Sequence, residues 1–88
     1  MSEIASVNEQ HSMIASYITE VLAKLLKVKP SNIDGSIPFD RLGLDSADAF
    51  RMVGSLNQRF ATDFEPTVLY EHPTVAELAT FVQGHIVR

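Results

Sequence analysis

The chain has 88 residues, of which 45% are hydrophobic and 20% are charged, and its formal net charge is −4. This length and composition predict one folded domain over residues 1–88, with its core at about 7–87. The acidic balance argues against nucleic acid as a partner, the absence of cysteine excludes disulfides and protein thiols, and three widely spaced histidines form no metal-binding motif.

The first predicted element is a long helix that ends just before Pro30. Its apolar positions recur in steps of three and four, which is helical spacing. They are Val7, His11, Ile14, Ile18, Val21, Leu25 and Val28. Ser6 and Glu9 fit a capping box at its start, and Pro30 should end it because the residue before a proline avoids the helical conformation. Leu22 and Leu26 widen the stripe, which favours a bundle helix over a coiled coil.

Residues 29–45 hold two prolines, two glycines and several Asp, Asn and Ser residues, a composition that predicts a loop. Apolar residues recur through this segment and should pin it to the core. They are Ile33, Ile37, Phe39, Leu42 and Leu44. Loops longer than about 12–15 residues are uncommon in compact domains and usually have a function.

A second helix is predicted from Ser46 to Ala61. Its inner face should hold four apolar residues in steps of three, three and four. They are Phe50, Val53, Leu56 and Phe60. Gly54 and Ser55 are poor helix formers in its middle. Their small size allows close approach either of another element or of a partner protein, and the sequence leaves both readings open.

The rest of the chain predicts one helical turn around 67–70 and a last helix after Thr74. Thr74 and Glu77 form a second capping box. The expected inner face of the last helix consists of Val75, Leu78, Val82 and Ile86. No segment alternates with period two, so the fold class is all-α, with three longer helices, one short helix and a long loop between the first two helices.

Ser46 stands where the long loop meets the second helix, flanked by Asp45 and Asp48. One interpretation is a helix cap, although position 49 is Ala and completes no capping box. A second interpretation is an acceptor for a phosphate-linked group, since a helix N-terminus stabilises an adjacent anion. A catalytic nucleophile is not supported, because "GLDSADAF" lacks the GxSxG pattern and no strand precedes it. We therefore predict no catalytic residue and no metal site.

Two segments carry a family resemblance. "PFDRLGLDSADAFRMVGSLNQRF" resembles the core of acyl carrier proteins, in which a Gly-x-Asp-Ser motif opens the second helix, and "LYEHPTVAELATFV" resembles the tail of carrier domains from polyketide and nonribosomal peptide synthases. The likeness covers about residues 10–87. It implies a four-helix bundle in which Ser46 receives 4′-phosphopantetheine from coenzyme A. The arm would carry acyl groups as thioesters, and the protein itself would not be an enzyme.

The resemblance also implies partners: a phosphopantetheinyl transferase, and a ketosynthase, an acyltransferase and other enzymes of polyketide or antibiotic biosynthesis. The expected docking surface is the outer face of the second helix beside Ser46. Its members are Asp45, Ala47, Asp48, Arg51, Met52, Gly54 and Gln58. With no apolar run of about 18 residues and no secretory leader, we expect a cytoplasmic monomer without a membrane partner.

Two departures from the family pattern bear on these partners. Fatty-acid carriers crowd glutamates along the second helix, whereas the formal charges from Asp45 to Arg59 cancel here, which favours a specialised synthase. The residue after the serine is usually large and apolar, but here it is Ala47. The alternatives are a peptidyl carrier of a nonribosomal peptide synthetase, although no "GGxSL" motif is present, and a small helical interaction module with Ser46 only as a cap.

Overall fold

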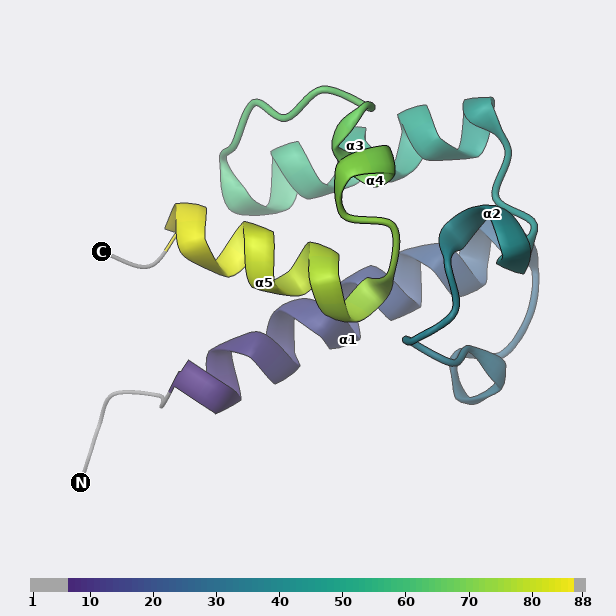
Figure 1. Ribbon diagram of the computed structural model, residues 1–88, viewed down its shortest axis with the longest axis horizontal. Helices are drawn as coiled ribbons and strands as arrows, with labels where there is room; N and C mark the ends of the chain where they lie inside the picture. Colours follow the sequence, from purple (N-terminus) through teal and green to yellow (C-terminus); the bar gives the residue numbers. More distant parts are fainter. Residues whose placement is uncertain (1–6, 87–88) are drawn as a thin grey trace.

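The computed structural model describes residues 7–86, which contain helices and no strand. The elements in chain order are α1 (Val7–Leu26), the 3₁₀ helix η1 (Pro30–Asn32), α2 (Phe39–Leu42), α3 (Ser46–Phe60), α4 (Val68–Glu71) and α5 (Val75–Ile86). α1 packs against both α5 and α3, and α2 lies close to the end where α3 begins (Figure 1). The predicted all-α class is confirmed, and none of the helices described here is long and apolar enough to cross a membrane.

The core is built from apolar side chains that every helix except η1 contributes. Its largest fully buried members are Ile18, Leu22, Met52, Leu56, Leu78 and Val82. α4, although only one turn long, adds Val68 and Leu69. Because α1, α3, α4 and α5 all bury one face in the same cluster, they form one layered bundle and not independent helices.

α1 ends at Leu26, several residues before Pro30, so the prediction that the proline terminates it is wrong. Lys27 takes the left-handed conformation with φ of 62°, and the Val28 amide donates to the Ala23 carbonyl at 3.0 Å. This is the hydrogen bond of a Schellman motif, which closes a helix without a proline. Val28 is therefore exposed and does not belong to the apolar stripe. The predicted cap at Ser6 lies outside the described residues.

The long loop contains a short helix, α2, that the sequence did not predict. Phe39 at its start is buried, and the Phe39 amide donates to the Pro73 carbonyl at 2.8 Å. Gly43 ends α2 with φ of 102°, a left-handed value that a residue with Cβ adopts only at a cost. Ile33, Leu42 and Leu44 pack against the core that contains Phe39, so the prediction that apolar residues pin the loop is confirmed for these four; Ile37 is not part of that cluster.

The register of α3 differs from the predicted one. Phe50, expected in the core, is 69% exposed, whereas Met52 is fully buried. Ala49 is partly buried against the same cluster as Val53 and Leu56. The buried stripe is therefore rotated toward Ala49 and Met52, and a small residue at position 49 allows the helix to pack closely against the core cluster.

The second half of the chain follows the sequence more closely. The Glu77 amide donates to Thr74 Oγ at 3.1 Å, which confirms the capping interaction predicted at the start of α5. Val75, Leu78 and Val82 are buried as expected, and Ile86 packs at the edge of the core. α4 begins one residue later than the predicted turn.

Candidate functional site

Ser46 is the first residue of α3, at the exit of the long loop, and its side chain is exposed. Within residues 7–86 its hydroxyl takes part in no hydrogen bond. The Leu44 amide donates to the Phe39 carbonyl at 3.1 Å, which closes the end of α2, and the Leu44 side chain packs against the core. An exposed hydroxyl thus stands on an ordered junction.

The cap of α3 is Asp45, not Ser46. The Asp45 backbone is extended, and its carboxylate accepts a hydrogen bond from the Asp48 amide at 2.8 Å. Aspartate is among the preferred N-cap residues because its side chain satisfies an amide that has no partner within the helix. The interpretation of Ser46 as a cap is therefore wrong, and the sequence signal that was missed is the aspartate immediately before it.

The electrostatic setting of Ser46 has two opposing parts. The N-terminus of α3 carries the positive end of the helix dipole, which favours a bound anion. Asp45 and Asp48 oppose this, but Asp48 also pairs with Arg51, whose Nη1 lies 3.2 Å from Asp48 Oδ1. The Asp45 carboxylate accepts a hydrogen bond from a backbone amide, and the Asp48 carboxylate is paired with the Arg51 guanidinium. Both interactions reduce the repulsion between these carboxylates and a phosphate at Ser46.

A hollow of about 420 Å³ lies beside Ser46, between the loop, α3 and α4. Its lining is mostly apolar and consists of Phe39, Asp40, Leu44, Asp45, Ser46, Ala49, Leu69, Tyr70 and Pro73. Ser46 is therefore at the border between open solvent and an apolar recess. A bulky group attached to its oxygen has room to leave the protein.

The predicted docking residues fall on the outer face of α3, with one exception. Ala47, Arg51, Gly54 and Gln58 are exposed, as is Asp45, and Asp48 is partly buried. Met52 is wholly buried in the core, so its assignment to the docking surface is wrong. Phe50 takes its place among the exposed residues, although a large aromatic residue at helical spacing predicts a core position.

None of the three histidines forms a hydrogen bond with Ser46. His11 Nε2 lies 3.1 Å from Thr80 Oγ1, His85 Nδ1 lies 3.0 Å from the Phe81 carbonyl, and the His72 ring stacks on Phe81 with centroids 4.2 Å apart. Among the residues the structure describes, no group of three or more metal-ligating side chains occurs. The arrangement supplies a nucleophilic oxygen without a base of its own, which fits an acceptor that another enzyme acts upon.

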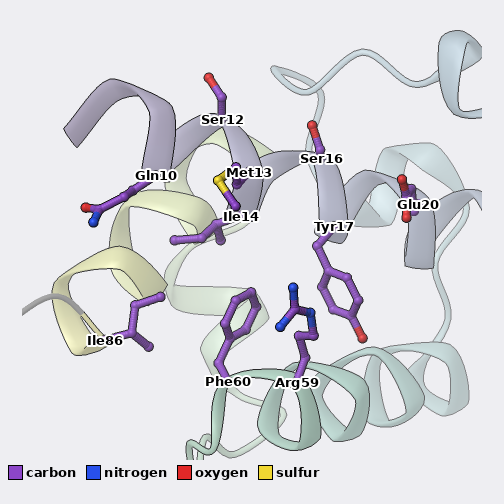
Figure 2. Close-up of a pocket in the computed structure, with 10 residues that line it drawn as sticks. All are labelled: Gln10, Ser12, Met13, Ile14, Ser16, Tyr17, Glu20, Arg59, Phe60 and Ile86. Carbon is purple, nitrogen blue, oxygen red and sulfur yellow. The ribbon is translucent and has the colours of Figure 1, made fainter. Parts of the chain in front are cut away.

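A second, larger hollow of about 550 Å³ lies between α1 and the C-terminal ends of α3 and α5 (Figure 2). Tyr17 reaches down from α1, while Phe60 and Arg59 reach up from α3, and the Arg59 guanidinium lies 5.7 Å from the Tyr17 ring centre (Figure 2). At about 1.5 Å per residue, Phe60 is about 20 Å along α3 from Ser46. This hollow is therefore separate from the serine site.

Comparison with known families gives one match over most of the chain. The family model described as "Phosphopantetheine attachment site" matches residues 16–82. Among curated proteins, polyketide synthase PksN of Bacillus subtilis is 33% identical over 69 residues, and polyketide synthase ThaG of Burkholderia thailandensis is 34% identical over 72 residues. These segments cover 78% and 82% of the chain but only 1% of each synthase, so the chain spans a very small part of the curated relatives it matches.

Two solved structures share the fold over nearly the whole chain. A free-standing peptidyl carrier protein from Acinetobacter baumannii superimposes with a TM-score of 0.85 at 30% identity, covering 86% of this chain and 95% of that one. The HMG-ACPI domain of the CurA module from Lyngbya majuscula gives a TM-score of 0.84 at 28% identity, covering 98% and 85%. The fold is therefore shared with this peptidyl carrier protein and with the HMG-ACPI domain.

Proposed function

The chain belongs to the phosphopantetheine attachment-site family, as a carrier domain related to those of polyketide synthases, and on this premise we propose that Ser46 is its attachment residue. The observation that carries the proposal is the exposed hydroxyl at the first position of α3, with the capping role taken by Asp45. The residues fit the group, since the helix terminus favours a phosphate and the adjacent hollow leaves space for a long substituent.

The proposed modification is a phosphoryl transfer to the Ser46 oxygen. Ser46 Oγ forms a bond to the phosphorus next to the pantetheine in coenzyme A, the bond from that phosphorus to adenosine 3′,5′-bisphosphate breaks, and the hydroxyl proton passes to a base of a phosphopantetheinyl transferase. This chain contributes the oxygen and its position at a rigid junction. Arg51 contributes by pairing with Asp48 beside the incoming phosphate.

When bound, the 4′-phosphopantetheine group supplies the terminal thiol that a chain without cysteine lacks, and this thiol carries acyl groups as thioesters. We propose that the protein presents such acyl intermediates to a ketosynthase, an acyltransferase and other enzymes of a polyketide synthase in the cytoplasm. It breaks no bond of the cargo itself. The polyketide assignment is supported by the names of the curated relatives.

A second candidate, a peptidyl carrier, rests on one observation, the likeness to the Acinetobacter baumannii protein, and the names of the curated relatives do not favour it. The two candidates share the arm and differ in the cargo. The protein that carries phosphopantetheine should be loaded by an acyltransferase that uses malonyl groups. An adenylation enzyme that uses amino acids should not load it. Loading by the adenylation enzyme alone would reverse the assignment.

The attachment itself is tested by intact-mass spectrometry after incubation with coenzyme A and a transferase of broad specificity. The wild-type protein should gain the mass of one phosphopantetheine, and Ser46→Ala should gain none. Ser55→Ala, which alters a partly buried serine further along the same helix, is the matched control and should be modified like the wild type. A wild-type protein that several transferases leave unmodified would favour the helical interaction module.

A further inference from the structure

A groove runs along α1 on the side where α1 faces α3, and the proposed attachment at Ser46 makes no use of it. The hollow of about 550 Å³ between α1 and the C-terminal ends of α3 and α5 (Figure 2) continues into a smaller one of about 250 Å³. Tyr17 and Glu20 line both hollows. We call this surface the α1 groove, and along α1 it is lined by Gln10, Met13, Tyr17, Glu20 and Lys24.

Met13 is an apolar side chain at the edge of the α1 groove, and it is 64% exposed. The hollow next to it has an apolar floor, to which Ile14, Phe60 and Ile86 contribute. An exposed apolar side chain and an apolar hollow therefore lie next to each other on one surface. Two copies of such a surface can fill each other, because a two-fold axis brings the side chain of each copy to the hollow of the other.

The charged groups of the α1 groove have no ionic partner within residues 7–86. The Arg59 guanidinium lies 5.7 Å from the centre of the Tyr17 ring and 5.5 Å from that of Phe60, and no carboxylate pairs with it. Glu20 and Lys24 are exposed, and neither forms an ion pair with another described residue. An occupant that complements the groove therefore brings acidic groups to Arg59 and Lys24.

The outer ridge of α1 beside the groove is low enough for another helix to lie against it. Ser12 and Ser16 are exposed on this ridge, one turn apart. Both also line a hollow of about 400 Å³ on the other side of the ridge. Since the distance between packed helices depends on the side chains at the contact, two serines allow a close approach. The surface therefore fits a helix that runs along α1.

A second copy of α1 brings both the apolar side chain and the acidic group that the groove lacks. When two α1 helices run antiparallel and cross between Ser16 and Tyr17, Met13 of each copy lies opposite Glu20 of the other. Met13 of the second copy then enters the hollow beside Tyr17. Glu20 of the second copy, opposite Met13, lies on the side of the hollow that holds Arg59.

The same register also brings opposite charges together near the ends of the helix pair. Glu9 is exposed in the first turn of α1, and it lies opposite Lys24 of the second copy. The two-fold axis repeats this pair and the pair of Arg59 with Glu20. Complementary charges of this kind fix the register of an interface more than they raise its affinity. The net charge of −4 on each chain opposes association, so the dimer is weak.

We propose that α1 is a self-association surface, through which two copies form a weak symmetric dimer with antiparallel α1 helices and Met13 of each copy in the hollow of the other. The dimer leaves both attachment residues open, since Ser46 lines the hollow next to α4 and not the α1 groove. The proposal is independent of the modification of Ser46. It replaces the monomer expected from the sequence, because the groove is formed by three helices that only the fold brings together.

The test is sedimentation equilibrium of the unmodified full chain at concentrations from about 10 μM to about 1 mM, a range that covers weak association. The wild-type protein should form a dimer within this range. Met13→Asp should raise the dissociation constant at least about tenfold, because it places a carboxylate in the apolar hollow opposite Glu20. Phe50→Asp is the matched control. Phe50 is 69% exposed and the change adds the same charge on α3, so the dissociation constant should not change.

A charge exchange tests the register. Glu20→Arg alone and Arg59→Glu alone should each weaken the dimer, and the double variant should recover most of the affinity, since the exchanged charges pair again across the axis. Circular dichroism establishes that each variant is folded. A double variant no tighter than the single variants contradicts the antiparallel register.

Two results overturn the proposal as a whole. A wild-type protein that remains monomeric at about 1 mM excludes a second copy as the occupant of the α1 groove. A dimer that Phe50→Asp abolishes and Met13→Asp preserves places the interface on α3 instead. Neither result bears on the attachment at Ser46, which intact-mass spectrometry measures separately.

Discussion

The carboxylate of Asp45 accepts a hydrogen bond from the amide of Asp48 at 2.8 Å, so the residue that caps α3 is the neighbour of the residue that receives the proposed modification. This separation has a consequence for Ser46. Its hydroxyl is not needed to begin the helix and can be esterified without loss of a cap. Stability and attachment should therefore respond to different substitutions.

Removal of the cap should destabilise the protein, and removal of the Ser46 hydroxyl should not. Asp45→Ala is expected to lower the free energy of unfolding by about 1 kcal/mol, because the Asp48 amide loses its partner. Ser46→Ala should change it by less than about 0.5 kcal/mol, as for an exposed residue without contacts. Urea denaturation measures both, with Asp45→Asn as a control that keeps a capping side chain. A larger loss for Ser46→Ala than for Asp45→Ala would contradict the assignment.

The register of α3 makes a second prediction. Met52→Ala should lower the free energy of unfolding by about 2–5 kcal/mol, because a fully buried side chain leaves a cavity. Phe50→Ala removes more atoms but should cost less than about 0.5 kcal/mol, since the ring is mostly in solvent. Urea denaturation of the pair is the measurement. A larger loss of unfolding free energy for Phe50→Ala than for Met52→Ala would contradict this register and support the one expected from the sequence.

These two residues also show what the sequence could and could not predict. Helical spacing was enough to place α3, but the stripe through Phe50 and the stripe through Met52 both fit a period of 3.6 residues. Hydrophobicity favoured Phe50 over Ala49. The choice between them depends on how α3 packs against α1 and the rest of the core, which is a tertiary effect that no local pattern contains.

The sequence also predicted one part of the candidate site and missed another. The position of Ser46 at the start of α3 followed from the composition of the loop and from the family resemblance. The cap at Asp45 was missed because Ser and Asp are both good caps, and adjacent candidates cannot be ranked without the backbone angles. The turn at Lys27 and the single-turn helix α2 were missed because neither has a periodic pattern long enough to detect.

A third prediction concerns Gly54, the exposed glycine of α3. Gly54→Ala should raise the free energy of unfolding by up to about 1 kcal/mol, because alanine favours the helix and nothing lies within 4 Å of the added methyl group. Gly84→Ala in α5 has equally open surroundings and should behave in the same way. If Gly54 belongs to the docking surface, only the variant at 54 should raise the KM of an enzyme partner. Equal kinetics for the two variants would remove Gly54 from that surface.

The charge on the outer face of α3 makes a fourth prediction. Arg51→Glu should alter turnover of the loaded carrier by its ketosynthase or acyltransferase partner while leaving the helical circular dichroism intact, since Arg51 is exposed and a pair at the surface contributes little stability. Arg59→Glu makes the same change of charge on the same helix, about 12 Å further from Ser46. Turnover that changes equally in both variants, or in neither, would count against the docking face.

A fifth prediction concerns the pKa of Asp34 in the loop before α2. The Ser36 hydroxyl donates to Asp34 Oδ1 at 2.7 Å, and this bond, with a second from the Ser36 amide, holds the pKa of Asp34 below its ordinary value. A lowered pKa stabilises the fold above the pKa of the unfolded chain, and this stabilisation is lost as the pH falls through the folded value. Ser36→Ala should therefore raise the pKa of Asp34 toward its ordinary value, as NMR titration of its carboxyl carbon would show.

The pH dependence of stability provides the matching control. The difference in free energy of unfolding between the wild type and Ser36→Ala should be greatest near neutral pH and should shrink as acid protonates Asp34. Asp34→Asn should abolish that dependence on pH. A pKa of Asp34 that does not move in Ser36→Ala would show that the serine hydroxyl is not its principal cause.

The proposed function requires that the hydroxyl oxygen of Ser46 is the one that is esterified. Peptide mapping by tandem mass spectrometry, after incubation of the wild-type protein with coenzyme A and a transferase, locates the added group directly. We expect the whole phosphopantetheine mass on the peptide that contains Ser46, with the other serines unmodified. Phosphopantetheine found on any other serine would contradict attachment at Ser46.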